Sequence, residues 1–321
     1  MQGNNNAKGV LIVNTGSPSL NTPKAIRTYL EEFLLDKRVI KIPRIIWLPI
    51  LYLIILPLRP KRKVKDYNKI WMKEGSPLLV ISKRILNKLK AQSKLKNIFF
   101  CMAMSYGKPS IKEQLAVFKK QNINQLTILP LFPQFSFSTT QSVIDRVHES
   151  LIQLDWQPKL KIINEYYEND IFINSLSKKI ANEWKVNGKK DLLVFTYHGL
   201  PKKYINDGDT YYQACLNTSK LVANKLKLSK KDYITSFHSK FGLGEWTKPY
   251  TEDLLKEMPK KGTTSIDIIS PTFSVDCLET LEEIAIQFKN DFIEAGGKEF
   301  NYIPCLNDSD EQISLIKKLI N

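Results

Sequence analysis

The chain has 321 residues, of which 43% are hydrophobic and 25% are charged, so it is long enough for two ordinary domains and lacks the composition of a disordered protein. Its formal net charge of +16 favours anionic partners such as acidic lipids or polycarboxylate ligands, although lysines spread over a solvated surface give the same charge. The basic residues are scattered and are not interleaved with aromatic residues, which argues against nucleic acid as a partner.

Apolar runs of strand length alternate with amphipathic segments of helix length along the whole chain. The eight expected strands cover residues 9–13, 97–104, 125–131, 160–163, 191–197, 233–237, 265–269 and 300–303. The clearest amphipathic segments between them are 111–120, 138–154, 171–185 and 211–226. Such an alternation predicts βαβ units and parallel sheets. We therefore expect an α/β fold of two Rossmann-like domains, 1–165 and 166–321, each with a four-stranded parallel sheet flanked by helices.

The cysteines and the first residues indicate the compartment. Cys101, Cys215, Cys277 and Cys305 are far apart and form no C-x-x-C pair, which argues against a zinc ribbon or a typical iron–sulfur run. Residues 1–6 are polar and lack the apolar core of a signal peptide. We expect a cytoplasmic protein with reduced thiols.

One very apolar segment, residues 43–58, interrupts the alternation and is followed by the basic residues 59–63. It is too short and too rich in proline for a transmembrane helix, which needs about 20 apolar residues. Trp47 and Tyr52, close to basic residues, suit a membrane interface or the rim of an apolar ligand pocket. A buried core helix is the alternative, because the segment is apolar nearly all round.

The chain has three histidines, and His198 follows directly on the expected buried strand 191–197. It precedes Gly199 and Pro201, so the strand ends there in a turn. Open α/β sheets bind ligands just beyond the carboxyl ends of their strands. Imidazole accepts and donates protons near neutral pH and binds metals, so His198 is the first candidate for chemistry, with a purely structural role as the alternative.

A second candidate follows the strand that ends at Ile269. At 3.6 residues per turn, Asp276, Glu279 and Glu283 share one face of the expected helix. Carboxylates there could bind a cation or pass protons. Acidic residues in a first helical turn are also favoured by the helix dipole, which is the structural alternative.

Residues 131–142 combine three phenylalanines with a cluster of hydroxyl groups. Ser138 or Thr139 could cap the following helix, and the N–H groups at a helix N-terminus attract carboxylates. The segment suits a flat aromatic ligand with acidic substituents, with plain helix capping as the alternative. No G-x-G-x-x-G follows the first strand and there is no G-x-x-x-x-G-K-[ST], which argues against a dehydrogenase or an ATPase.

Taken together, these segments resemble the ferrochelatase family, in the form found in many Gram-negative bacteria. The resemblance runs from about residue 9 to residue 308. It rests on seven stretches in the right order: Leu11–Pro18, Gly75–Leu78, Leu129–Ser136, Tyr197–Pro201, Ser236–Gly242, Glu245–Trp246 and Asp276–Leu281.

The resemblance implies an enzyme that inserts Fe(II) into protoporphyrin IX, the last step of haem synthesis, with a cleft between its two domains. It implies His198 and Glu279 as catalytic and metal-binding residues, and Asp276 and Glu283 as a path for protons and metal. It also implies two further sets of residues. The porphyrin contacts would be Thr15, Ser76, Tyr106, Ser136, Thr139 and Trp246, and the lip of the cleft, within residues 43–63, would include Trp47, Leu51, Leu53 and Arg59.

Three positions depart from the pattern of the family. Ser105 stands where many relatives carry Arg, His238 replaces a common Gln, and Thr15 stands where Leu or Met is frequent. The cysteine-bearing extension of the iron–sulfur relatives is missing, so we expect no cluster and no tightly bound cofactor, with Fe(II) as a substrate.

The expected partners are therefore a porphyrin and Fe(II), with peripheral contact to the inner membrane as a further possibility. The oligomeric state stays open. Three other functions remain as alternatives: a non-catalytic haem or porphyrin carrier on the same fold, a chelatase for another metal or a more carboxylated porphyrin, and, disfavoured by the missing phosphate loop, a nucleotide-dependent enzyme.

Overall fold

The structure is a computed structural model that describes residues 7–92, 98–242 and 244–321. The polar N-terminus, residues 1–6, and residue 97 of the expected second strand lie outside the described residues. The chain divides into two compact units. Unit 1 comprises residues 1–132, 136–164 and 316–321, and unit 2 comprises residues 133–135 and 165–315.

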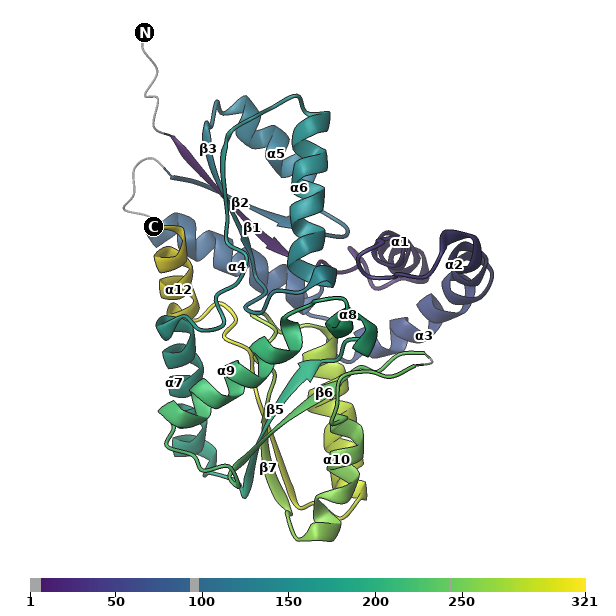
Figure 1. The fold of residues 1–321 in the computed structure, drawn as a ribbon, viewed down its shortest axis with the longest axis vertical. Helices are drawn as coiled ribbons and strands as arrows, with labels where there is room; N and C mark the ends of the chain where they lie inside the picture. Colours follow the sequence, from purple (N-terminus) through teal and green to yellow (C-terminus); the bar gives the residue numbers. More distant parts are fainter. Residues whose placement is uncertain (1–6, 93–97, 243) are drawn as a thin grey trace. The chain divides into compact units, whose positions relative to one another are not determined.

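Unit 1 is built on a four-stranded parallel sheet with the strand order β2-β1-β3-β4 (Figure 1). The strands are β1 (Lys8–Asn14), β2 (Ile98–Met104), β3 (Gln125–Pro130) and β4 (Lys159–Ile162). The helices are α1 (Pro23–Leu34), α2 (Arg44–Ile50), the π-helical η1 (Leu51–Ile55), α3 (Leu56–Asn68), α4 (Pro77–Gln92), α5 (Ile111–Lys120), the π-helical η2 (Phe137–Gln141) and α6 (Ser142–Gln153).

Unit 2 has a second parallel sheet with the equivalent order β6-β5-β7-β8. The strands are β5 (Leu192–His198), β6 (Tyr233–His238), β7 (Ser265–Ile269) and β8 (Glu299–Ile303). The helices are α7 (Asp170–Asn187), α8 (Lys202–Asn206), α9 (Tyr211–Lys225), α10 (Thr251–Glu257), the 3₁₀-helix η3 (Pro259–Lys261), the π-helical η4 (Glu279–Phe288), α11 (Lys289–Glu294) and α12 (Asp310–Ile320), whose last residues belong to unit 1.

The sheets form because their central strands are apolar on both faces. In β1 every residue from Gly9 to Asn14 is buried, as in a parallel sheet covered by helices on both sides. Helices α5 and α6 pack on the sheet of unit 1 through Leu115, Phe118 and Val147. In unit 2, residues of α10, η4 and α11 pack against β5 and β7, while α7 and α9 lie on the other side of that sheet (Figure 1).

All eight expected strands are present with ends within two residues of those expected, and both sheets are parallel. The prediction of two four-stranded α/β sheets flanked by helices is confirmed. The strand order adds what the sequence could not supply. In each sheet the order of strands reverses between two neighbouring strands, β1 and β3 in unit 1 and β5 and β7 in unit 2, because the chain leaves these strands in opposite directions. We call this place the reversal point. Open α/β sheets bind their ligands beyond the carboxyl ends of the strands at such a point.

The apolar segment 43–58 is helical, and its two faces differ. Trp47 and Leu51 are buried inside unit 1, where the indole N–H of Trp47 donates to the carbonyl of Leu34 at 2.8 Å. One face of this helix is therefore core, as the alternative held, and the place of Trp47 and Leu51 in the lip of a cleft stays a prediction. The other face of the helix is exposed, with Leu53 76% accessible, and Arg59 on α3 is half-buried.

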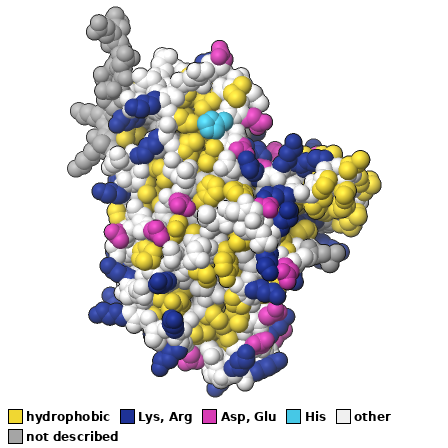
Figure 2. Space-filling view, in the orientation of Figure 1, with side chains coloured by type: hydrophobic (Ala, Val, Ile, Leu, Met, Phe, Trp, Pro, Cys, Tyr) yellow, Lys and Arg dark blue, Asp and Glu magenta, His cyan; other side chains and the backbone are white. Residues whose placement is uncertain are grey.

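The exposed face forms what we call the apolar tip, and hydrophobic side chains gather there over α2 and α3 in Figure 2. Its residues are Ile45, Ile46, Leu53, Ile54 and Leu58. None of the helices in the described ranges combines the length and the apolarity that crossing a bilayer requires.

Candidate functional site

His198 is the last residue of β5, the strand beside which the sheet order of unit 2 reverses. Its side chain is half-buried, and its Nδ1 lies 2.8 Å from the carbonyl oxygen of Gly199. A carbonyl oxygen only accepts, so Nδ1 carries a proton in this contact, and in the neutral ring Nε2 is the nitrogen with the lone pair. The backbone thus holds the imidazole of His198 in the tautomer that can accept a proton or bind a metal through Nε2.

The turn after His198 depends on glycine. The N–H of Gly199 donates to the carbonyl of His238 at 2.8 Å, and a Cβ at Gly199 would lie 2.9 Å from that oxygen and 3.3 Å from the Trp246 ring. Only a residue without a side chain fits such an approach. The loop after β6 folds back here: Trp246 pairs with Pro201 as an isolated bridge. The structure therefore brings the predicted Trp246 next to the His198 turn.

His238 ends the neighbouring strand β6 and is the register partner of His198. The two rings stand edge to face with centroids 5.8 Å apart. His238 is only 1% exposed, and burial, together with the nearby His198, holds its pKa well below the usual range for histidine. Unit 2 therefore carries two imidazoles side by side at the carboxyl edge of its sheet.

Glu279 is positioned by the segment that follows β7, the other strand of the reversal point. It is half-buried and is the first residue of η4. Its carboxylate lies beside the buried thiol of Cys277, whose pKa is raised well above its usual value by burial and then by Glu279. No hydrogen bond or ion pair joins Glu279 to His198 within the described residues. The two residues are related by position: each follows or ends a strand at the carboxyl edge of the unit 2 sheet.

The predicted acidic face does not form. The expectation assumed 3.6 residues per turn from Asp276 onward, but the helical turns begin two residues later and run as a π-helix from Glu279 to Phe288, with a different side-chain period. Glu283 accepts a hydrogen bond from Ser239 at 2.5 Å, so it faces the loop after β6.

Asp276 lies outside the helix and is 4% exposed. Its carboxylate accepts hydrogen bonds from the Tyr302 hydroxyl at 2.5 Å and from the Asn307 amide at 2.6 Å, and the Thr280 hydroxyl lies at 3.0 Å. These bonds tie the loop before η4 to β8 and to the loop after it. The geometry gives Asp276 a role in positioning the start of η4, and hence Glu279.

The predicted porphyrin contacts of unit 1 fall into two groups. Ser76 and Ser136 are buried, and their hydroxyls accept backbone N–H bonds from Leu79 at 3.5 Å and from Ser138 at 3.3 Å, so both cap helices. Thr15 is half-buried at the end of β1. The hydroxyl of Thr139 is buried without a hydrogen-bond partner in the part of the chain that the structure describes, as is that of Ser105.

Tyr106 is 2% exposed and belongs to a polar cluster around Asp36. The carboxylate of Asp36 accepts hydrogen bonds from the hydroxyls of Tyr106 at 2.9 Å and Ser142 at 2.5 Å, and from the guanidinium of Arg146 at 3.1 Å. Burial and the charge of Asp36 raise the pKa of Tyr106, so its phenol stays protonated. The Tyr106 hydroxyl therefore donates its proton to Asp36 inside unit 1, a structural role that the sequence did not indicate.

We expect Asp36→Asn to lower the free energy of unfolding by about 3 kcal/mol, because it leaves the buried partners of the carboxylate poorly paired. Burial raises the pKa of Asp36, but hydrogen bonds from Ser142, the Arg38 N–H and Tyr106, with the charge of Arg146, outweigh it and lower the pKa overall. The contribution is therefore complete above the unfolded pKa and is lost as the pH falls through the folded value.

Urea unfolding of the wild type and the variant at neutral and acidic pH measures both effects. The control is Asp145→Asn, which breaks a largely exposed pair with Arg38 and should cost less than about 1 kcal/mol. Equal losses in the two variants would contradict the role of Asp36.

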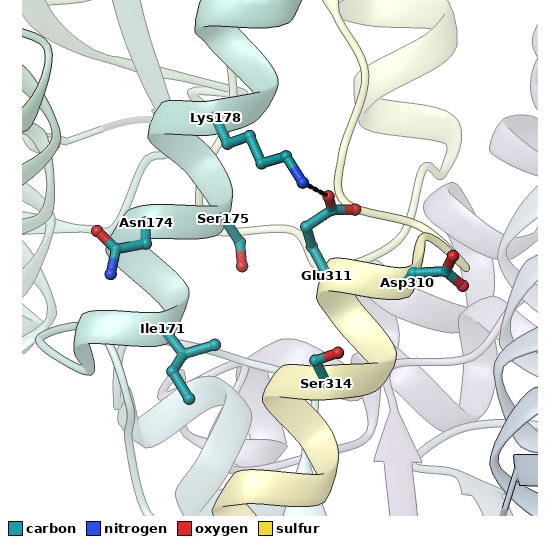
Figure 3. A pocket seen from close by; sticks show the side chains of 7 residues that line it. All are labelled: Ile171, Asn174, Ser175, Lys178, Asp310, Glu311 and Ser314. Carbon is teal, nitrogen blue, oxygen red and sulfur yellow. Dashed lines mark hydrogen bonds and ion pairs between the residues drawn. The ribbon is translucent and has the colours of Figure 1, made fainter.

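A surface cavity of about 390 Å³ lies elsewhere in unit 2, between α7 and α12 (Figure 3). The Lys178–Glu311 ion pair at 2.6 Å spans it, and Asp310 and Ser314 line the α12 side. Both charges of the pair are satisfied and neither sheet's carboxyl edge contributes a residue, so the cavity has no part in the chemistry of His198. Among the described residues, no three His, Cys, Asp or Glu side chains are grouped so as to hold a metal ion.

Two parallel sheets of equivalent strand order define an α/β fold that this chain shares with solved chelatases. SirB from Bacillus subtilis, solved with Fe³⁺, is similar with a TM-score of 0.58 and 11% identity over 98% of this chain and 94% of that one. CbiX, the terminal enzyme of sirohaem biosynthesis in denitrifying bacteria, is similar with a TM-score of 0.51 and 12% identity over 97% of each chain. At such identities the likeness shows the fold alone.

The sequence narrows this class to one family. The ferrochelatase family model matches residues 7–321. The ferrochelatase of Vibrio atlanticus is 44% identical over 317 residues, 99% of this chain and 98% of the relative. That of Photobacterium profundum is 44% identical over 316 residues, 98% of this chain and 97% of the relative. The chain belongs to the ferrochelatase family and is a lyase. The resemblance inferred from the seven stretches is confirmed.

Proposed function

We propose that this chain inserts Fe(II) into protoporphyrin IX to form protohaem, and that His198 and Glu279 carry the chemistry. The observation that carries the proposal is the position of His198, at the end of the strand where the sheet order of unit 2 reverses, in a chain that matches the ferrochelatase family over almost its whole length. Glu279 follows the other strand of that point.

His198 supplies the proton acceptor. When Fe(II) replaces the two pyrrole protons of the porphyrin, the products are the metalloporphyrin and two protons, so the site must take protons away. Nδ1 of His198 is held by the Gly199 carbonyl, and Nε2 presents a lone pair that accepts one of them or holds the metal. A half-buried imidazole is shielded enough to keep this orientation and open enough to reach a substrate.

Glu279 supplies negative charge. Fe(II) loses its water shell as it enters the porphyrin ring, so water no longer screens the positive charge of the ion. The carboxylate of Glu279, at the edge of the sheet, offsets that charge. The thiol of Cys277 lies beside Glu279, and burial together with the carboxylate raises the pKa of this thiol well above its usual value. Asp276, with Tyr302 and Asn307, holds the start of η4 in place.

Each unit, taken by itself, carries predicted porphyrin contacts. Trp246, beside the His198 turn, offers a half-exposed aromatic face. In unit 1, Thr15 and the unpartnered hydroxyl of Thr139 are the predicted residues still able to bind a substituent.

The decisive experiment is optical. Purified protein is mixed anaerobically with protoporphyrin IX and Fe(II), and the metal-free absorption bands should collapse into the haem spectrum over many turnovers. Tight binding of porphyrin with no turnover would favour the carrier. Faster insertion of another divalent metal, or of Fe(II) into a more carboxylated porphyrin, would favour the related chelatase. Acid-labile sulfide measured on the same preparation tests the expected absence of a cluster.

The apolar tip also supports peripheral contact with a membrane. Five large apolar side chains are exposed there on α2, η1 and α3, and the exposed Lys61 and Arg62 follow in the next turn. Apolar residues that enter the headgroup region beside cations that attract anionic lipids form an interfacial anchor.

We expect Leu53→Glu to lower binding to vesicles of phosphatidylethanolamine and phosphatidylglycerol by at least about tenfold, since burying one Leu is worth about 1.5–3 kcal/mol. Co-sedimentation measures the bound fraction. The matched control is Ile152→Glu on α6, a side chain 79% exposed and outside the tip, which should leave binding unchanged. No binding by the wild type, or equal losses in both variants, would contradict the anchor.

A further inference from the structure

We propose that His238 gives the incoming metal ion a second imidazole nitrogen beside His198. This inference rests on the proposed function and deepens it: the metal would be met by two nitrogen ligands from neighbouring strands, with Glu279 supplying charge. Imidazole pairs suit borderline ions such as Fe²⁺, Co²⁺ and Zn²⁺ better than the hard ions Mg²⁺ and Ca²⁺, so His238 would help to select the metal.

The first support is a chain of buried hydroxyls that fixes the tautomer of His238. Thr251 donates its hydroxyl proton to Ser236 at 2.9 Å. A hydroxyl has a single proton, so in the 2.7 Å contact between Thr196 and Thr251 the donor is Thr196. Thr196 is then the acceptor in its 2.8 Å contact with Nδ1 of His238. Nδ1 of His238 therefore carries the proton, and Nε2 carries a lone pair.

The second support is that this lone pair is unused. Nε2 of His238 is buried and has no hydrogen-bond partner among the residues that the structure describes. A buried polar atom without a partner costs about 1–3 kcal/mol and calls for an explanation. The rings in contact with His238 are Phe273, Phe288 and His198, and the last of these alone carries polar atoms. A metal ion would supply the missing partner, because the Nε2 lone pair can donate to it beside the second imidazole, that of His198.

The third support is the spacing of the rings. A metal bound by Nε2 at about 2.1 Å lies about 3 Å from the ring centre, so two imidazoles that share a metal have their centres about 5–6.5 Å apart. The rings of His198 and His238 are 5.8 Å apart. Both have Nδ1 held, one by the Gly199 carbonyl and one by the Thr196 hydroxyl, which is how proteins orient histidine ligands.

The test uses Zn²⁺ alone as a redox-stable probe, without porphyrin. The chain has three histidines, and His148 is exposed on α6, so His148→Ala removes the surface site and leaves two imidazoles to observe. Long-range ¹H–¹⁵N spectra of histidine-labelled protein report the proton and the metal on each nitrogen. Before Zn²⁺ is added, Nε2 of His238 should be unprotonated. At saturation, the Nε2 resonances of both His198 and His238 should shift.

The variant His238→Gln should weaken Zn²⁺ binding by at least about tenfold, as loss of a metal contact does, and should raise KM for Fe(II) more than it lowers kcat. If this variant does not fold, the spectra of the His148→Ala protein still show whether Zn²⁺ binds to Nε2 of His238. A protonated Nε2 on His238, or no shift of His238 when His198 responds, would overturn the inference and leave the proposed function intact. Absence of insertion by the wild type would instead overturn the proposed function.

Discussion

Replacing His198 with alanine is expected to lower the rate of Fe(II) insertion by at least about a hundredfold, because it removes the proton acceptor at the reversal point of the unit 2 sheet. The fold should persist. The one hydrogen bond described for the side chain is to the carbonyl of the next residue, and the ring is half-buried, so truncation opens no core cavity. Anaerobic conversion of protoporphyrin IX to protohaem under saturating Fe(II), followed optically, measures the rate.

The control for His198 is His148→Ala, which removes an exposed imidazole and should leave the rate unchanged. Circular dichroism and urea unfolding of both variants separate loss of chemistry from loss of structure. Near-normal turnover in the His198 variant would remove this residue from the mechanism, whatever the behaviour of the control.

Replacing Glu279 with glutamine is expected to lower the rate by a similar factor, about a hundredfold or more, through charge alone. Glutamine keeps the size of the side chain and its hydrogen-bonding reach, so η4 should start at the same residue. What is lost is the negative charge that offsets Fe(II) as its water shell is removed. The same optical assay applies, with porphyrin binding measured separately by fluorescence quenching, which should change little.

The control for Glu279 is Glu294→Gln, an exposed carboxylate on α11, the helix that continues η4. It removes the same charge from the continuation of the same helix and should leave the rate unchanged. If the two variants lose equal activity, the effect is one of net charge. If neither loses activity while the His198 variant does, the imidazole acts without a carboxylate at this position.

Much of the fold could be predicted because parallel strands buried on both faces must be apolar throughout. Runs such as Val10–Val13 and Leu192–Phe195 stand out from the amphipathic segments around them, and their ends marked the strands to within two residues. The same reasoning placed His198 at a strand end, where the structure has it. Local pattern sufficed because each of these features is set by a few consecutive residues.

Local sequence pattern was not enough in two segments of the chain. The acidic face of Asp276, Glu279 and Glu283 assumed an α-helical period, whereas the segment is π-helical and Asp276 bonds with Tyr302 and Asn307 on another part of the chain. Trp47 and Leu51 looked equivalent to Leu53 in a helix apolar all round, and only packing inside unit 1 separates the buried face from the exposed one. Both outcomes depend on residues distant in sequence.

By itself, the sequence determined the α/β class, the strands, the family and the candidate histidine, because these follow from short apolar runs and from ordered motifs. Only the tertiary structure decided that β5 and β7 are neighbours, and so that His198 and the segment of Glu279 reach one edge of one sheet. It also placed His238 beside His198 with an unused nitrogen. The physical reason is that strand order and register are set by side-chain packing between segments tens of residues apart, which no local pattern records.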